Sequence, residues 1–532
     1  MRRGSNAIET AKDALCGDPL RIRDELPQII ARGEAALTKV QKDLLKWLGL
    51  FARVRTPGKF MLRIRIPNGF ATSAQFWAIA DLSERLGNSV VDITTRQQVE
   101  LRGFTLETVP EIFERLRSVD LHSLQTGMDN VRNINGCPLA GLTPNELLDA
   151  SPIVHDLDAL IVGRDGNSEF ANLPRKFNVT ITGCLDNCTH AESQDIALVP
   201  AVSGDREGFN VLVGGKMGSG GFTIASPLDV FIGPSGAAAL VAELIRMYRD
   251  HGPRDARGRC RFAFLVEEWG LHRLRAELTE RMGRELSLAG IDVRSTRHAD
   301  HLGVCRQTTD GLVSVGLCVP TGRVNPEQMR GLARIAEDCG SGRIRLTTGQ
   351  NAIIPDVPAG SVERLLGEPL LAQFSPSASP FVRGLVSCIG TDFCNLALID
   401  TKGPALALAK TLEQRLGSRG SLLTMHWSGC QAGCGNHQAA DIGFRGLRTT
   451  VDGKTVDAVA VYVGGRTGPD AAAGEQIFDN VPCDALPDVV ERLLSNYERT
   501  LSHGSPERTG VDDVGPAGGA AKGVAADDAD AA

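Results

Sequence analysis

Hydrophobic and polar residues alternate along two short stretches of the chain, 60–66 and 311–319, and this alternation predicts two half-buried strands. Each stretch is followed by a Pro-x-Gly turn, a segment of helical period, a glycine, and a second apolar run that ends in Thr-Thr-x-Gln. The segments that carry this order, 67–98 and 320–351, align with each other without a gap. The pattern therefore predicts an α/β half-module that occurs twice.

A second unit also recurs in the chain. Residues 183–199 match 429–444, including a Gly-Cys-x-x-x-Cys opening and a shared Asp-Ile, and residues 211–218 match 461–468. The simplest interpretation is a duplicated α+β protein with pseudo-twofold symmetry, built from two small modules and two larger α/β modules. A ligand would then lie between the halves. The alternative is a pair of independent tandem domains.

Length and charge narrow the class of protein. A chain of 532 residues is too long for one ordinary domain. The net charge of -7 argues against nucleic-acid binding, since no basic excess is available to neutralise phosphates. No apolar run is long enough to span a bilayer, and the first residues contain no apolar signal-peptide core. We therefore expect a cytoplasmic protein with no membrane partner.

Four of the thirteen cysteines form two close pairs in the second half. Cys388 and Cys394 are separated by five residues, and Cys430 and Cys434 by three. Four clustered thiolates in a reducing compartment favour a [4Fe–4S] cluster. A zinc site is the first alternative, but its pairs usually have shorter spacings. Unliganded structural cysteines are the second.

The first half keeps a related but weaker cysteine pattern. Cys184 and Cys188 repeat the second pair, with His190 close by and Cys137 earlier in the chain. We interpret these cysteines as remnants of the duplication. A second cluster is the alternative.

Five motifs in one order carry a resemblance to a known family. They are the Cys-x5-Cys…Cys-x3-Cys block together with KWLGLFARVRTPGKFMLRIRIPNG, DITTRQQVELRG, GMDNVRNINGCPLAG and NLPRKFNVTITG. From about Leu45 to about Asn496 the chain resembles the sirohaem-dependent nitrite and sulfite reductases, and most of all their ferredoxin-dependent assimilatory nitrite reductases. The resemblance implies sirohaem and a [4Fe–4S] cluster as cofactors, and two ferredoxin-like half-modules beside the two α/β modules.

The resemblance also implies boundaries and roles. The predicted boundaries are 1–57 for an N-terminal helical segment, 58–125 and 300–375 for the ferredoxin-like half-modules, 126–290 for the first sirohaem- and substrate-binding module, 376–500 for the cluster-bearing module, and 501–532 for a disordered tail. By resemblance, Cys434 bridges the cluster to the sirohaem iron. The residues expected to hold anionic substrate and relay protons are Arg63, Arg132 and Lys176, and those expected to bind macrocycle carboxylates are Arg96 and Gln97.

Two positions bear on substrate and cofactor contact. Sulfite-reducing members of the family carry a second lysine two positions after Lys176, where this chain has Asn178. One positive charge fewer suits a monoanion such as nitrite better than a dianion such as sulfite. Related sequences often have a glutamine where this chain has Glu100, and a glutamate that meets a macrocycle carboxylate must be protonated or turned away.

These observations predict ferredoxin-dependent reduction of nitrite to ammonium by six electrons. No flavin or NAD(P)H module is recognisable, so reduced ferredoxin is the expected donor, and we expect a monomer. The nearest alternative is an assimilatory sulfite reductase with the same cofactors. Two others are a cobalamin-synthesis oxygenase of the same cluster fold without sirohaem, and an iron–sulfur structural or sensor protein.

Overall fold

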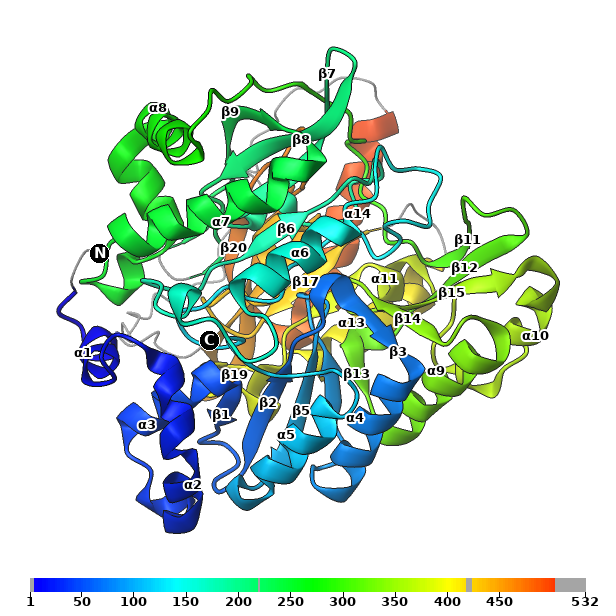
Figure 1. Cartoon of the computed structure of the whole chain (residues 1–532). Coiled ribbons are helices and arrows are strands. Elements are labelled where there is room, and N and C mark those ends of the chain that lie inside the picture. Colours follow the sequence, from blue (N-terminus) through cyan, green and yellow to red (C-terminus); the bar gives the residue numbers. More distant parts are fainter. Residues whose placement is uncertain (1–3, 219–220, 418–422, 503–532) are drawn as a thin grey trace.

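The computed structural model describes residues 4–218, 221–417 and 423–502. Within these ranges the chain forms four five-stranded sheets, two in small modules and two in larger ones (Figure 1). This confirms the predicted duplicated α+β class. The boundary residues predicted between modules stay predictions.

The two small sheets exchange their edge strands. The first sheet has the order β1 (Leu50–Ala52), β2 (Phe60–Ile64), β5 (Val99–Phe104), β4 (Val91–Ile93) and β13 (Arg323–Val324), and β13 comes from the second half. The second has the order β11 (Gly303–Arg306), β12 (Leu312–Leu317), β15 (Ala352–Pro358), β14 (Arg343–Leu346) and β3 (Phe70–Thr72), and β3 comes from the first half. The two half-modules therefore form one unit. This excludes independent tandem domains.

Helices α4 (Ser73–Arg85) and α9 (Pro326–Cys339) pack against each other across this unit (Figure 1). Each begins with a capping box, formed by Thr72 with Gln75 and by Asn325 with Gln328. Their apolar faces join one core that spans both small sheets. The remaining helices beside these sheets are α5 (Val109–Arg117) and α10 (Val362–Leu366).

Two glutamines at equivalent positions of the repeat form hydrogen bonds between the two halves. Gln97 Nε2 donates to the carbonyl of Leu346, and Gln350 Nε2 donates to the carbonyl of Ile93. The Gln97 oxygen accepts from the Gly136 amide as the Gln350 oxygen accepts from the Ser387 amide. Each glutamine of the repeated Thr-Thr-x-Gln motif therefore holds the other half in place.

The larger modules contain the other two sheets. One has the order β10 (Ile291–Asp292), β7 (Ile196–Ser203), β8 (Arg206–Val213) and β9 (Ser226–Ile232), with β6 (Val179–Ile181) beside β7. The other has the order β16 (Leu385–Ser387), β17 (Met425–Ser428), β18 (Ile442–Val451), β19 (Lys454–Val463) and β20 (Glu475–Pro482). The pair β6–β7 is parallel, as is β17–β18. The repeat therefore extends to these sheets.

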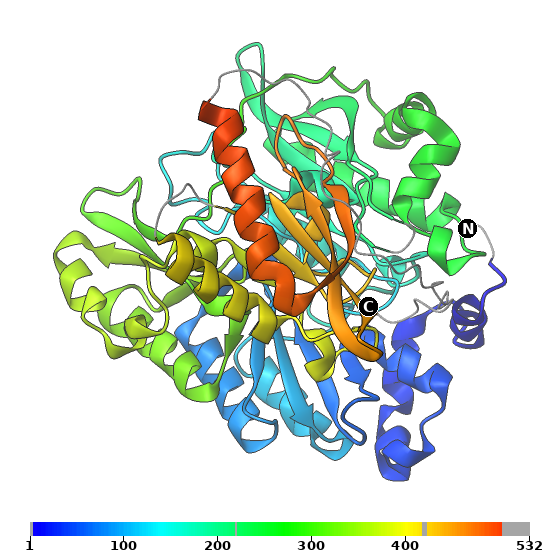
Figure 2. The same cartoon turned by 180° about the vertical axis from the view of Figure 1, so that it is seen from behind.

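Helices cover the larger sheets and bury their apolar side chains in separate cores. They are α6 (Ser151–Ile161), α7 (Pro234–His251) and α8 (Phe262–Met282) in the first module, and α11 (Pro380–Arg383), α12 (Gly390–Phe393), α13 (Lys402–Leu416) and α14 (Leu486–Ser502) in the second. Figure 2 shows α14 in orange-red on the back of the molecule.

The N-terminal segment contains α1 (Ala7–Ala14), α2 (Ile22–Arg32) and α3 (Lys39–Leu44), and it then supplies β1 to the first sheet. The predicted tail lies outside the described residues from 503 onwards. None of the helices described is long and apolar enough to cross a membrane.

Candidate active site

Four cysteines of the second half meet at one edge of its sheet. Cys388 follows β16 directly, Cys394 follows α12, and Cys430 and Cys434 lie in the loop after β17. Because β16 and β17 run parallel, their carboxyl ends share that edge. The four cysteines line one cavity of about 90 Å³. The structure thus brings together the four predicted cluster ligands.

The environment of these thiols favours metal binding over free thiolate. Burial raises the pKa of Cys388 to about 11 and that of Cys430 to about 12, and the neighbouring Cys434 adds to both shifts. The Gly429 amide donates a hydrogen bond to Cys388 Sγ at 3.1 Å. Without metal both thiols stay protonated at neutral pH, so metal binding must release their protons.

Cys434 lies between two cavities. It lines the cavity of the four cysteines and also a second one, which contains Lys176 and Asn178 from the first half. The Thr95 hydroxyl, in the loop after β4, donates to the carbonyl of Cys434 at 3.2 Å. Its position fits the predicted role of a ligand shared by the cluster and a second iron.

Arg63, on β2, faces Glu100, its partner in register on β5. Its Nη2 lies 3.0 Å from Glu100 Oε1, and Arg102 holds the other carboxylate oxygen. Burial opposes ionisation, but the guanidinium groups of Arg102 and Arg63 hold the pKa of Glu100 below its usual value. Glu100 is therefore ionised and bound to arginines, not protonated.

Arg96 and Asn178 contact each other directly. Arg96 Nε donates to the Asn178 side-chain oxygen at 3.1 Å, and the backbone N–H of Asn178 donates to Asp195 Oδ2 at 2.8 Å. Asp195 in turn forms a fully buried ion pair with Arg261, with Nη2 at 2.6 Å from Oδ2. Burial, Arg63 and Arg261 lower the pKa of Arg96. Asn178 is thus held on both sides.

Arg132 and Lys176 are buried, and neither forms an ion pair with a described residue. Neither Nη atom of Arg132 has a hydrogen-bond partner among the described residues. Burial, followed by repulsion from Arg63 and Arg96, lowers the pKa of Arg132 well below its usual value. Burial, followed by Arg261 and Arg96, does the same to Lys176. A buried guanidinium with unused donors favours an anionic ligand.

Gln97 does not line either cavity. Both of its amide hydrogens bind backbone carbonyls, those of Gly136 and Leu346, and its oxygen accepts from the Gly136 amide. Its side chain therefore connects the halves, and contact with a macrocycle carboxylate stays a prediction.

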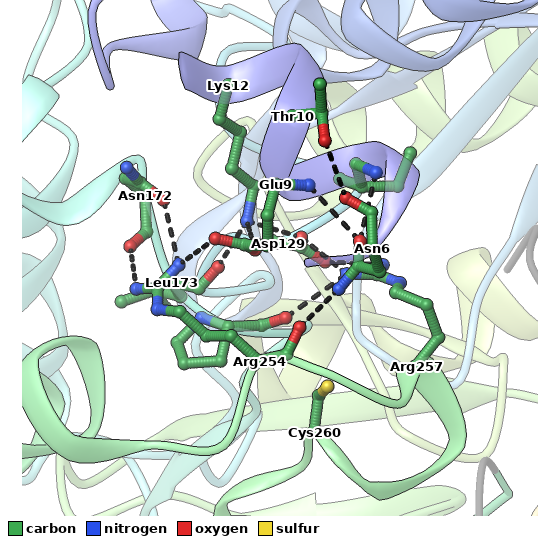
Figure 3. Close-up of polar contacts among 12 residues, drawn as sticks. Asn6, Glu9, Thr10, Lys12, Asp129, Asn172, Leu173, Arg254, Arg257 and Cys260 are labelled. Carbon is green, nitrogen blue, oxygen red and sulfur yellow. Dashed lines mark hydrogen bonds and ion pairs between the residues drawn. The ribbon is translucent and has the colours of Figure 1, made fainter. Parts of the chain in front are cut away.

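Figure 3 shows a buried ion network that supports segments 129–133 and 172–178, which carry Arg132 and Lys176. Lys12 Nζ, from α1, lies 2.7 Å from Asp129 Oδ2 and donates to a backbone carbonyl at 2.8 Å. The other charged members are Glu9, Arg254 and Arg257. The N-terminal helix thereby fixes the backbone that presents the two cations.

Two family models match this chain along the duplication. The nitrite and sulphite reductase 4Fe-4S domain matches residues 127–286 and 378–511, and the nitrite/sulfite reductase ferredoxin-like half domain matches 53–119 and 306–372. Together these matches cover most of the sequence. The chain belongs to the nitrite and sulfite reductase family.

Individual members of the family match over nearly the whole chain. Ferredoxin–nitrite reductase of Synechococcus elongatus is 43% identical over 481 residues, which cover 90% of this chain and 94% of that protein. The assimilatory ferredoxin-dependent nitrite reductase of Haloferax mediterranei is 37% identical, covering 96% and 92%. The solved structure of Mycobacterium tuberculosis NirA protein has a TM-score of 0.88 at 28% identity, covering 94% and 95%.

The cofactors of this family are a [4Fe–4S] cluster and sirohaem. The residues present fit both: four cysteines line one cavity, and unpaired donors of Arg132 lie among other cations, as the carboxylates of sirohaem require. Gly433, with a φ of 67°, brings the cysteine loop close to Met217, since a Cβ there would lie 2.7 Å from Met217 Cγ.

Sequence reasoning missed several members of the site. Arg53 lines the cysteine cavity, and burial, followed by Arg102, lowers its pKa to about 10. Asp195 and Arg261 position Asn178, and Thr95 holds the loop of Cys434. Asp195 belongs to the Asp-Ile pair that both repeats share, so the sequence offered a reason to consider it. Arg261 lies 66 residues from Asp195 and belongs to no motif, so nothing in the sequence indicated it.

Proposed function

We propose that this family member is a ferredoxin-dependent nitrite reductase. Nitrite, six electrons and eight protons give ammonium and two molecules of water. The observation that carries the proposal is the position of Cys434, which lines both the four-cysteine cavity and the cavity of Lys176 and Asn178. These cysteines would hold a cluster that supplies electrons, and Cys434 would bring it next to the cavity in which an anion binds.

When bound, the cluster and sirohaem supply the electron path and the iron that holds the substrate nitrogen. The chain supplies charge and protons. Arg132 lines neither cavity, but its Nη donors have no hydrogen-bond partner among the described residues, and we assign them to a nitrite oxygen. Lys176 has a pKa well below the usual value because of burial and neighbouring arginines, so its ammonium gives up a proton more readily than an exposed lysine.

Asn178 favours nitrite over sulfite. Its amide oxygen accepts from Arg96 at 3.1 Å, and this leaves the cavity one positive charge short of what a lysine would give. A dianion gains more than a monoanion from an added cation in a buried site. Lysine at this position would also repel Arg96.

Electrons enter beside Arg55, which is exposed. Its Nε donates to the Cys394 carbonyl at 2.8 Å and its Nη2 to the Ala397 carbonyl at 2.9 Å. An acidic ferredoxin is attracted to this charge above the cluster ligand. We further propose that the enzyme is monomeric and cytoplasmic.

The test is turnover of the purified holoenzyme on nitrite and sulfite, with reduced ferredoxin as donor. Asn178→Lys should raise the sulfite-to-nitrite ratio of kcat/KM about tenfold. Gln28→Lys, an exposed position on α2, adds the same charge elsewhere and should change nothing. An unchanged ratio in Asn178→Lys would contradict the substrate assignment, and wild-type preference for sulfite would overturn the function.

A second experiment tests the donor. Arg55→Glu should raise the KM for ferredoxin about tenfold and leave turnover with a small dye donor unchanged. Arg117→Glu, an exposed arginine on α5, is the control. Equal effects of Arg55→Glu on both donors would place ferredoxin elsewhere.

A further inference from the structure

Three cysteines of the first half occupy the positions of three cluster cysteines in the second. In the alignment of the two repeats, Cys184 corresponds to Cys430 and Cys188 to Cys434. The hydroxyl of Thr348 donates to the Cys188 carbonyl at 3.2 Å, as Thr95 does to Cys434 at the same distance. The two loops are therefore held in the same way.

The sheet register places the third cysteine. Asn135 bridges Thr180 in parallel, and Val386 pairs in parallel with His426, which is the counterpart of Thr180. Cys137 and Cys388 each lie two residues further along. Cys137 therefore corresponds to Cys388, although their spacings to the next cysteine pair differ.

The fourth member of this first-half set is His301. It lies just before β11, in the segment that leads from the first half into the second. His301 Nε2 is 3.5 Å from Cys137 Sγ and 3.9 Å from Cys184 Sγ. The three sulfurs and one ring nitrogen all lie within 4.8 Å of one another, and all four residues are buried.

We propose that Cys137, Cys184, Cys188 and His301 bind one zinc ion in a closed, structural site. Tetrahedral zinc with its usual bond lengths separates a sulfur from a nitrogen ligand by about 3.6 Å and two sulfurs by about 3.8 Å. The two observed sulfur–nitrogen separations, 3.5 and 3.9 Å, lie on either side of the first value, and the 4.8 Å limit on all pairs leaves room for the second. Four protein ligands leave no open position, so the ion is structural.

The surroundings of the four ligands are those of a metal site. Nδ1 of His301, the ring nitrogen that does not approach the sulfurs, lies 4.0 Å from Asp186 Oδ2. The Leu139 amide donates to Cys137 Sγ at 3.3 Å, and the Asp186 amide donates to Cys184 Sγ at 3.4 Å. The two N–H donors stabilise the thiolates, and the nearby Asp186 carboxylate favours a cation at this site.

The compactness of the set distinguishes one ion from a cluster. Among the described residues, no other place brings three or more such ligand atoms within 4.8 Å of one another, and the four cysteines of the second half are farther apart. A cubane places its iron atoms between the thiolates and so needs that wider spacing. A zinc ion here ties the loops after residue 135 and after β6 to the segment that enters the second half.

The test is the metal content of the purified holoenzyme, grown with zinc supplied. We expect one zinc per chain beside the four cluster irons and the sirohaem iron. X-ray absorption at the zinc edge should show three sulfurs at about 2.3 Å and one nitrogen at about 2.0 Å. Both measurements use the wild-type chain and so do not depend on whether a variant folds.

Variants assign the ligands. Cys137→Ser and His301→Ala should each lose at least nine-tenths of the zinc and keep the iron content and haem-like absorption. Cys305 packs against the same buried group of side chains as the three cysteines but is not one of the four ligands, so Cys305→Ser should keep the zinc. Wild-type protein without zinc, an additional cluster instead of zinc, or a disulfide among the three cysteines would each overturn the proposal. Zinc bound with other ligands, or retained in both variants, would do the same.

Discussion

The two cysteine sets occupy corresponding loops of the two halves, yet their surroundings differ. Cys434 and its partners line one cavity, and Cys434 also lines a second, cationic one. The first-half set is compact, buried and completed by a histidine from the connecting segment. After duplication the same backbone thus supports an electron-transfer site in one half and a closed site in the other. What differs is the fourth ligand and the spacing of the sulfurs.

The largest expected effect comes from removing the corresponding cysteine in each of the two sets. Cys434→Ser should abolish nitrite turnover, by about a thousandfold or more, since it removes the ligand common to both cavities. Cys188→Ser, the corresponding change in the first half, should lose zinc and keep turnover within about threefold. Iron analysis, absorption spectra and ammonium production measure both. Equal loss of turnover would mean that the halves are functionally alike.

The next effect concerns the buried ion network under the first half. Asp129 is fully buried between Lys12 and Arg257, and Asp129→Asn removes the buried anion that these two cations share. We expect a loss of about 3–5 kcal/mol in unfolding free energy. Asp488→Asn, at an exposed pair with Arg415 in the second half, should cost far less because solvent screens that pair. Urea unfolding of holoenzyme compares them, and similar losses would refute the anchoring role.

The third effect separates a buried arginine proposed to bind substrate from a buried arginine near the first-half cysteines. Arg132→Met removes the buried donors proposed to hold nitrite, and kcat/KM should fall about a hundredfold, or about 2.7 kcal/mol. Arg345→Met removes another buried arginine, near Cys137, and should leave kcat/KM within about threefold. Steady-state kinetics with a dye donor decides this. A normal KM and kcat in Arg132→Met would remove it from the site.

The smallest effect is on pH. His190 of the first half and His426 of the second have ring centroids 5.5 Å apart. Burial lowers the pKa of His426 to about 4, and burial together with His426 lowers that of His190 well below its usual value. The unfolded chain binds these protons first, so stability is full above pH 6.5 and falls below it, by at most about 1.4 kcal/mol per pH unit for each histidine.

Unfolding midpoints between pH 7 and pH 4.5 measure this dependence. His426→Gln should flatten the slope, since it removes one of the two groups. A slope equal to that of the wild type would assign the acid sensitivity to other groups.

Much of the architecture could be predicted because the internal repeat is recognisable from the sequence alone. Segments 67–98 and 320–351 carry the same turn, helix and strand signals, and both copies fold as predicted. The exchange of β3 and β13 could not be predicted, since strand pairing depends on tertiary packing that local patterns do not encode. The pairing of Glu100 with arginines was likewise a matter of neighbours in space.

The two metal sites differ in the same respect. Close spacing made Cys388, Cys394, Cys430 and Cys434 recognisable. In the first half the sequence indicated Cys137, Cys184 and Cys188 with His190 nearby, but not His301, which is a single histidine in a connecting segment. Only the register of β6 with residue 135 shows that Cys137 and Cys388 correspond. The interpretation of these cysteines as remnants of the duplication stays a prediction, and the zinc content of the holoenzyme decides between it and the proposed zinc site.

The most direct test of the account is the stoichiometry of one reaction. The wild-type holoenzyme, given nitrite and reduced ferredoxin, should oxidise six ferredoxins and produce one ammonium for each nitrite consumed. Fewer electrons with another nitrogen product, or turnover of sulfite but not of nitrite, would contradict it.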